Sequence, residues 1–116
     1  MMMCEATRNQ IALLEEIHET IVYILECLLQ HCYGDAKLEH GLLAKDVAAM
    51  ESLHPGYRRA VVAALNEMES DIRGENRGRA AWKLINLRHE LRDTVCSLTG
   101  EKRWYPSASI IDAGTS

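Results

Sequence analysis

The segment EEIHETIVYILECLLQHC, residues 15–32, is strongly apolar and contains two histidines and two cysteines. It belongs to a longer stretch, residues 6–33, that has neither glycine nor proline, and Gly34 follows as a typical helix stop. We therefore expect a first helix over residues 6–33, about 40 Å long at a rise of 1.5 Å per residue. On a helical wheel its apolar arc runs from Leu13 to Val22 and covers about half of the circumference. An arc of this width is too large for a peripheral helix.

The wide apolar face of this helix predicts a homodimer. Because the first helix is longer than its expected neighbours, part of its apolar surface is left for a second subunit. Within this face, His18 is interpreted as a polar residue in a packed seam, where it would fix register and oligomeric state. The predicted interface residues are Leu14, Ile17, His18, Ile21, Leu25, Leu28 and Cys32.

The rest of the chain predicts further helices of one domain. Apolar residues recur at helical spacing in a short segment, residues 42–53, and in two longer ones, residues 55–72 and 76–99. Helices joined by short connections pack as antiparallel neighbours, so the expected fold is all-α. It is a small up-and-down helical bundle of three long helices and one short helix, formed by residues 1–100. Residues 101–116 have no helical period and are predicted to be an extended or partly disordered tail.

Composition indicates a globular protein with an aliphatic core. The 116 residues are 47% hydrophobic and 26% charged, and phenylalanine is absent. The first residues do not resemble a signal peptide, and no segment approaches the roughly 20 apolar residues of a membrane span. We therefore expect a cytoplasmic protein without a membrane partner. In that reducing compartment the four cysteines are expected to be free thiols.

Two pairs of histidine and cysteine predict an alternative, a metal-binding helical bundle. Cys27 and His31 lie four residues apart on one side of the first helix, and His89 and Cys96 lie seven apart on the last. If these helices are antiparallel, the two pairs can meet and supply the four ligands of a zinc site. Structural zinc sites more often use closely spaced cysteines in loops, so the main expectation is no metal and no cofactor.

Two Glu-x-x-His motifs suggest a second metal hypothesis. Glu15 precedes His18, and Glu51 precedes His54, at the spacing that di-iron helical bundles use. However, Glu15 lies on the outer side of the apolar arc, and His54 stands at a helix end before Pro55. We therefore expect no cofactor.

A helix-turn-helix is a further alternative and predicts a DNA-binding regulator. Residues 42–65 place Pro55 and Gly56 at the turn, and Arg58 and Arg59 open the second helix. The whole chain carries a net charge of −4, whereas DNA-binding domains are usually basic. Nucleic acid is therefore not the expected partner.

Charge and aromatic residues indicate where a protein partner would bind. Residues 1–33 hold one Arg against five Glu, whereas residues 73–103 hold eight Lys and Arg against four acids. No catalytic constellation has a local signature, so we expect a regulatory or adaptor protein that binds other proteins and has no catalytic activity. Basic and aromatic side chains are enriched at binding hot spots. The predicted partner-binding residues are Arg77, Arg79, Trp104 and Tyr105.

Overall fold

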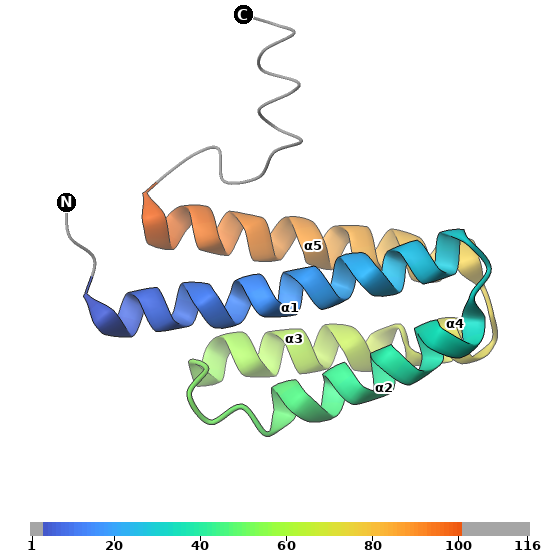
Figure 1. Ribbon diagram of the computed structural model, residues 1–116, viewed down its shortest axis with the longest axis horizontal. Helices are drawn as coiled ribbons and strands as arrows, with labels where there is room; N and C mark the ends of the chain where they lie inside the picture. The colour runs from blue at the N-terminus through green and yellow to red at the C-terminus, as the bar shows by residue number, and fades with distance from the viewer. Residues whose placement is uncertain (1–3, 101–116) are drawn as a thin grey trace, which may run out of the picture.

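The computed structural model describes residues 4–100, and these residues form helices without any strand. The helices are α1 (Glu5–Leu29), α2 (Tyr33–Ala48), α3 (Pro55–Glu67), α4 (Glu69–Arg73) and α5 (Arg77–Thr99). Successive long helices run in opposite directions, and α4 is a single turn that continues α3 (Figure 1). The predicted all-α, up-and-down fold is confirmed. The predicted tail and two predicted partner-binding residues, Trp104 and Tyr105, lie outside the described residues.

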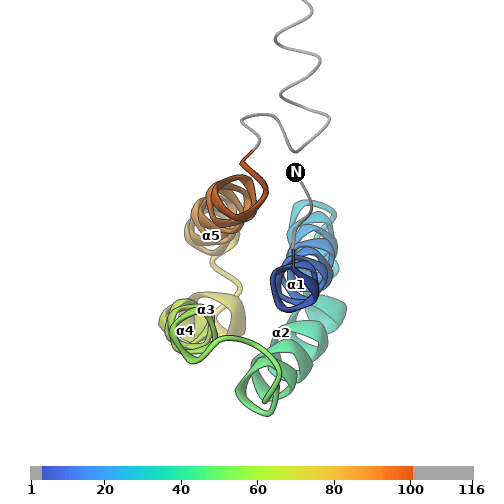
Figure 2. The ribbon, with the colours of Figure 1, turned by 90° about the vertical axis from the view of Figure 1, so that its left-hand side faces the viewer.

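The helices surround one core, with α1 packed between α5 and α2 (Figure 2). The contact of α1 with α5 is the most extensive in the molecule, and those of α1 with α2 and of α2 with α3 follow. By contrast, α3 and α5 touch only sparsely. The ring of helices is therefore least closed between α3 and α5.

The wide apolar face of α1 is covered by the same chain. Its buried residues are Ile11, Leu14, Ile17, Ile21, Ile24, Leu25, Cys27 and Leu28. Five of the predicted interface residues are among them, whereas His18 is half-buried and Cys32 is exposed. The reason is that α5 has 23 residues against 25 in α1 and runs along nearly its whole length. This face is thus not a free association surface, and the homodimer itself stays a prediction.

The end of α1 differs from the predicted stop. The helix ends at Leu29, and the chain turns at His31, which adopts a left-handed φ of 61°. Gly34 and Gly41 instead lie inside α2, where a Cβ atom at either position would have open space around it. The stripe Ala36, His40, Leu43 and Val47 explains this, because its helical spacing buries one continuous face of α2. The helix α2 therefore begins earlier and also ends earlier than the predicted short helix over residues 42–53.

The third predicted helix is interrupted at Met68, where α3 ends and α4 begins. The last helix begins as predicted, since the Asn76 Oδ1 atom accepts a hydrogen bond from the Arg79 N–H group at 3.3 Å. It ends at Gly100, whose φ of 76° is the left-handed conformation common after helices. Within residues 4–100, no helix is both long enough and apolar enough to span a membrane.

Candidate functional site

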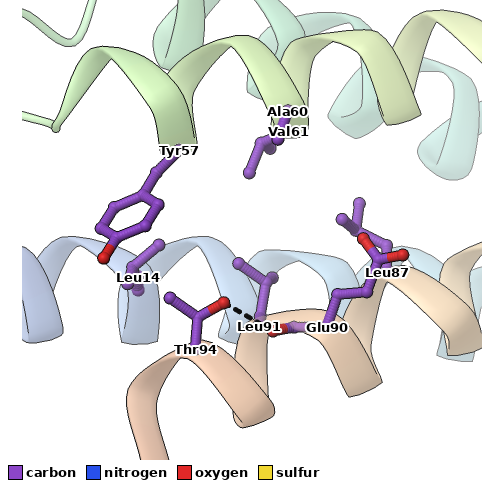
Figure 3. A pocket seen from close by; sticks show the side chains of 8 residues that line it. All are labelled: Leu14, Tyr57, Ala60, Val61, Leu87, Glu90, Leu91 and Thr94. Carbon is purple, nitrogen blue, oxygen red and sulfur yellow. Dashed lines mark hydrogen bonds between the residues drawn. The ribbon is translucent and has the colours of Figure 1, made fainter. Parts of the chain in front are cut away.

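A hollow lies between α3 and α5, where the helix ring is least closed (Figure 3). It has a volume of about 50 Å³ and is lined by Leu14, Tyr57, Ala60, Val61, Leu87, Glu90, Leu91 and Thr94. Val61 from α3 and Leu91 from α5 point toward each other across it, and Leu14 of α1 lies beneath (Figure 3). The floor is thus aliphatic.

A second hollow, of about 220 Å³, continues the first along the same two helices. Its lining residues are Ala64, Glu67, Met68, Trp82, Lys83, Asn86, Leu87 and Glu90. Because Leu87 and Glu90 line both hollows, we treat them as one feature, the α3–α5 groove. Between Trp82 and Thr94 the groove follows α5 for about 18 Å at 1.5 Å per residue.

The local sequence explains why the groove stays open. On α3, the residues at four-residue spacing along this side are Ala60 and Ala64, whose side chains end at Cβ. On α5, the rim consists of Trp82, Asn86, Glu90 and Thr94, also at four-residue spacing. At Ala60 and Ala64 the α3 wall has no side chain beyond Cβ to fill the space that faces α5.

The groove rim is acidic. Glu67 and Glu90 are exposed, and neither carboxylate forms an ion pair within the described part of the chain. Lys83 also lines the groove, but its Nζ atom donates to Asp71 Oδ2 at 2.6 Å and to the Glu67 carbonyl at 3.2 Å. The positive charge of Lys83 is therefore already paired, and the two glutamates determine the charge of the rim.

Asp71 links α4 to α5 at one end of the groove. The hydrogen bond from Lys83, supported by the charges of Lys83 and Arg79, lowers the pKa of this buried carboxyl group against the opposing effect of burial. Arg79, a predicted partner-binding residue, lies with its Nε atom 3.7 Å from Asp71 Oδ1. Arg77, the other described one, is exposed in the first turn of α5. Neither arginine lines the groove.

The predicted metal ligands are not brought together. The helices α1 and α5 are antiparallel (Figure 1), as the metal hypothesis requires, but Cys27 and His31 lie at the C-terminal end of α1, whereas His89 and Cys96 lie in the middle and at the C-terminal end of α5. With Leu14 opposite Leu91, Cys27 lies about 16 Å along the axis from His89 and about 27 Å from Cys96. No group of three or more His, Cys, Asp or Glu residues in the described chain can hold a metal ion. Burial also raises the pKa of the Cys27 thiol, which disfavours the thiolate that metals bind.

The Glu-x-x-His motifs do not form one site either. His18 lies half-buried between α1 and α5, and burial, followed by the charges of Arg88 and Arg92, lowers its pKa to about 4. Two guanidinium groups near this imidazole oppose the binding of a cation there. His54 has a structural role at the start of α3, since its Nδ1 atom accepts a hydrogen bond from the Gly56 N–H group at 3.0 Å.

The helix-turn-helix alternative is not supported by the arrangement of α2 and α3. These helices lie side by side and antiparallel (Figures 1 and 2), whereas a helix-turn-helix crosses at about 90–120°. Arg58 closes the connection between them, because its Nη1 atom donates to the Met50 carbonyl at 3.3 Å. That arginine stabilises a loop and is not a free recognition residue.

Sequence reasoning did not identify the α3–α5 groove. The available signals were the alanines at positions 60 and 64 and the position of Trp82 on the polar side of the last helix. Comparison of the chain with protein-family models, with curated proteins and with solved structures found no match in any of the three.

Proposed function

We propose that this chain is a helical protein–protein interaction module, regulatory or adaptor in role and without catalytic activity, which binds its partner in the α3–α5 groove. The observation that carries the proposal is the hollow between α3 and α5, whose aliphatic floor is formed by the buried side chains Val61, Leu87 and Leu91. An amphipathic helix of about three turns fits a groove of this length and presents apolar anchors at four-residue intervals.

The size of the hollows favours side chains of a partner over a small molecule. The two hollows hold about 50 Å³ and 220 Å³, both below the roughly 300–1,000 Å³ of ligand pockets. The smaller one suits the end of one apolar side chain. Trp82 lines the larger one and is 65% exposed, and tryptophan is enriched at binding hot spots. Covering such a side chain contributes about 1.5–3 kcal/mol.

The negative charge of the groove rim indicates which residues the partner carries. The unpaired carboxylates Glu67 and Glu90 flank the aliphatic floor, so a matching segment carries Lys or Arg beside its apolar anchors. Such rim charges mainly raise the association rate and the salt dependence of binding, while the buried anchors determine the dissociation rate.

A matched pair of substitutions on α3 tests the proposal. Ala60 and Ala63 are both exposed, but Ala60 lines the groove, whereas Ala63 lines a different surface with Ala48 and Arg59. The full chain and its Ala60→Lys and Ala63→Lys variants are used for capture from cell extract, and the affinity of each captured protein is then measured in purified form. We expect Ala60→Lys to weaken binding at least about tenfold, or about 1.4 kcal/mol, and Ala63→Lys to leave it unchanged. Equal effects of the two variants would contradict the assignment of the groove.

We also propose that the chain acts as a homodimer in the cytoplasm. A dimer needs a surface other than the covered face of α1, and Leu38 and Leu42, one turn apart on α2, are 59% and 46% exposed. All four cysteines are free thiols, as a reducing compartment would leave them. Light scattering should give about twice 13.1 kDa, and Leu38→Lys should return the protein to a monomer. A monomer at every concentration would rule out the dimer.

A further inference from the structure

Cys27 and Cys32 lie on either side of the turn that ends α1. The His31 N–H group donates to the Leu28 carbonyl at 3.1 Å, and the Cys32 N–H group donates to the Cys27 carbonyl at 2.7 Å. With the left-handed φ of 61° at His31, these bonds form a Schellman motif, in which the side chains at the Cys27 and Cys32 positions commonly contact each other. On a continuous helix the same two residues would point in different directions. The turn therefore brings together two thiols that helical spacing would separate.

The backbone of this turn has the dimensions that a disulfide needs. With standard bond lengths, the 2.7 Å hydrogen bond keeps the Cα atoms of Cys27 and Cys32 within about 6.6 Å of each other. Disulfides join Cα atoms that are roughly 4.4–6.8 Å apart. The Cys32 Sγ atom also donates to the Gln30 carbonyl at 3.8 Å, so this side chain lies back over the end of α1. A bond between the two sulfurs can therefore form without unfolding either helix.

The two thiols differ in their access to solvent. Cys32 is exposed before the first turn of α2, whereas Cys27 is 6% exposed. Burial raises the pKa of the Cys27 thiol. A hydrogen bond with Tyr23 opposes this rise in pKa, and the negative charges of Asp35 and Cys32 add to it. Cys32 is thus the thiol that a reagent in solution reaches first, and Cys27 is the neighbour that reacts with it next.

We propose that Cys27 and Cys32 form a site of reversible oxidation, which a small-molecule disulfide such as oxidised glutathione converts from a dithiol to an intramolecular disulfide. The Cys32 thiolate attacks one sulfur of the small disulfide, whose S–S bond breaks, and one small thiol leaves with the proton that Cys32 lost. The Cys27 thiolate then attacks the Cys32 sulfur and expels the second small thiol, which takes the Cys27 proton. The cysteines lose two electrons, and the small disulfide is reduced to two thiols. Neither cysteine lines the α3–α5 groove, so this site does not rest on the proposed function.

Equilibration with glutathione tests this site. In the full chain, Cys4→Ser with Cys96→Ser leaves Cys27 and Cys32 as the only cysteines. This variant is equilibrated with mixtures of reduced and oxidised glutathione, quenched with acid, alkylated and weighed by mass spectrometry. We expect a single chain that lacks two hydrogen atoms, carries neither an alkyl group nor glutathione, and is restored by dithiothreitol. Adding Cys27→Ala should instead leave a stable glutathione adduct on Cys32, and adding Cys32→Ser should remove both products. Circular dichroism confirms that each variant is folded.

The folded turn, and not only the short spacing in the sequence, should favour the disulfide. We expect the equilibrium constant for its formation with glutathione to be at least about tenfold higher in the folded protein than in urea, because folding already holds the two cysteines together. The ratio of disulfide to dithiol at each glutathione mixture gives this constant in both states. By the same linkage, the disulfide form should unfold at a higher urea concentration than the dithiol form.

Three results would overturn the inference. Only mixed disulfides with glutathione in the variant that keeps Cys27 and Cys32 would show that the two thiols do not reach each other. Disulfide-linked dimers as the main product, lost on dilution, would show that the bond forms between chains. Equal equilibrium constants in the folded protein and in urea would show that the turn does not hold the thiols together.

Discussion

His18 makes the stability of the bundle depend on pH. Its pKa is lowered to about 4 by burial and by Arg88 and Arg92, whereas the ordinary value is near 6.5. Between these values the unfolded chain binds more protons than the folded chain, so stability falls as the pH falls through this window. We predict that His18→Gln reduces the loss of stability between neutral pH and about pH 5, as measured by urea unfolding.

His31→Asn is a suitable control for this measurement. His31 is exposed in the turn after α1 and has a left-handed φ, which asparagine tolerates. This variant should keep the pH dependence of the original protein. An unchanged pH dependence in His18→Gln would show that His18 is not the titrating group.

Leu84 is fully buried on α5, at the centre of its core-facing side. Leu84→Ala leaves a cavity and is predicted to lower the free energy of unfolding by about 2–5 kcal/mol. Leu29, which is 53% exposed at the end of α1, supplies the comparison, and Leu29→Ala should cost less than about 1 kcal/mol. Urea unfolding at neutral pH measures both changes. Similar losses in the two variants would contradict the assignment of Leu84 to the core.

The connection between α2 and α3 is held by α1 through Gln10. The Nε2 atom of Gln10 donates to the Ser52 carbonyl at 2.7 Å, and its Oε1 atom accepts from the His54 N–H group at 2.7 Å. Gln10→Ala removes both bonds and should lower stability by about 1–2 kcal/mol, since both atoms are exposed. Hydrogen exchange of the His54 amide should become faster, while that of the Leu84 amide in α5 follows only the global loss. An unchanged exchange rate of the His54 amide would show that the two Gln10 hydrogen bonds do not form in solution.

Helix existence could be predicted from the sequence better than helix ends. The first and last helices were found because both have long apolar periodicity, and the predicted range 76–99 agrees closely with α5. The start of α2 was missed because Gly34 was interpreted as a helix stop and the short helix was predicted only from residue 42. Gly34 and Gly41 both lie within α2, on its exposed side. The local sequence does not show which residues other helices will bury. It therefore cannot decide whether such a glycine ends a helix or lies inside one.

The helices that cover the apolar face of α1 could not be predicted, because helical periodicity gives the width of an apolar face but not the element that packs against it. The structure places α5 and α2 on this face, and the same packing leaves α3 and α5 apart. The α3–α5 groove depends on this three-dimensional arrangement, since Val61 and Leu91 are 30 residues apart in the chain. The two pairs of His and Cys are separated for a related reason: α1 and α5 are antiparallel, as the metal hypothesis required, but their register, with Leu14 opposite Leu91, does not bring the pairs together.

The central claim is that the α3–α5 groove is the surface that binds other proteins. Methyl NMR of the isotope-labelled full chain, titrated with a purified protein that it captures, tests this most directly. We predict that the methyl signals of Val61, Leu87 and Leu91 shift on binding, while those of Leu38 and Leu42 on the outer face of α2 stay in place. Shifts confined to Leu38 and Leu42, with the groove signals unchanged, would contradict the claim.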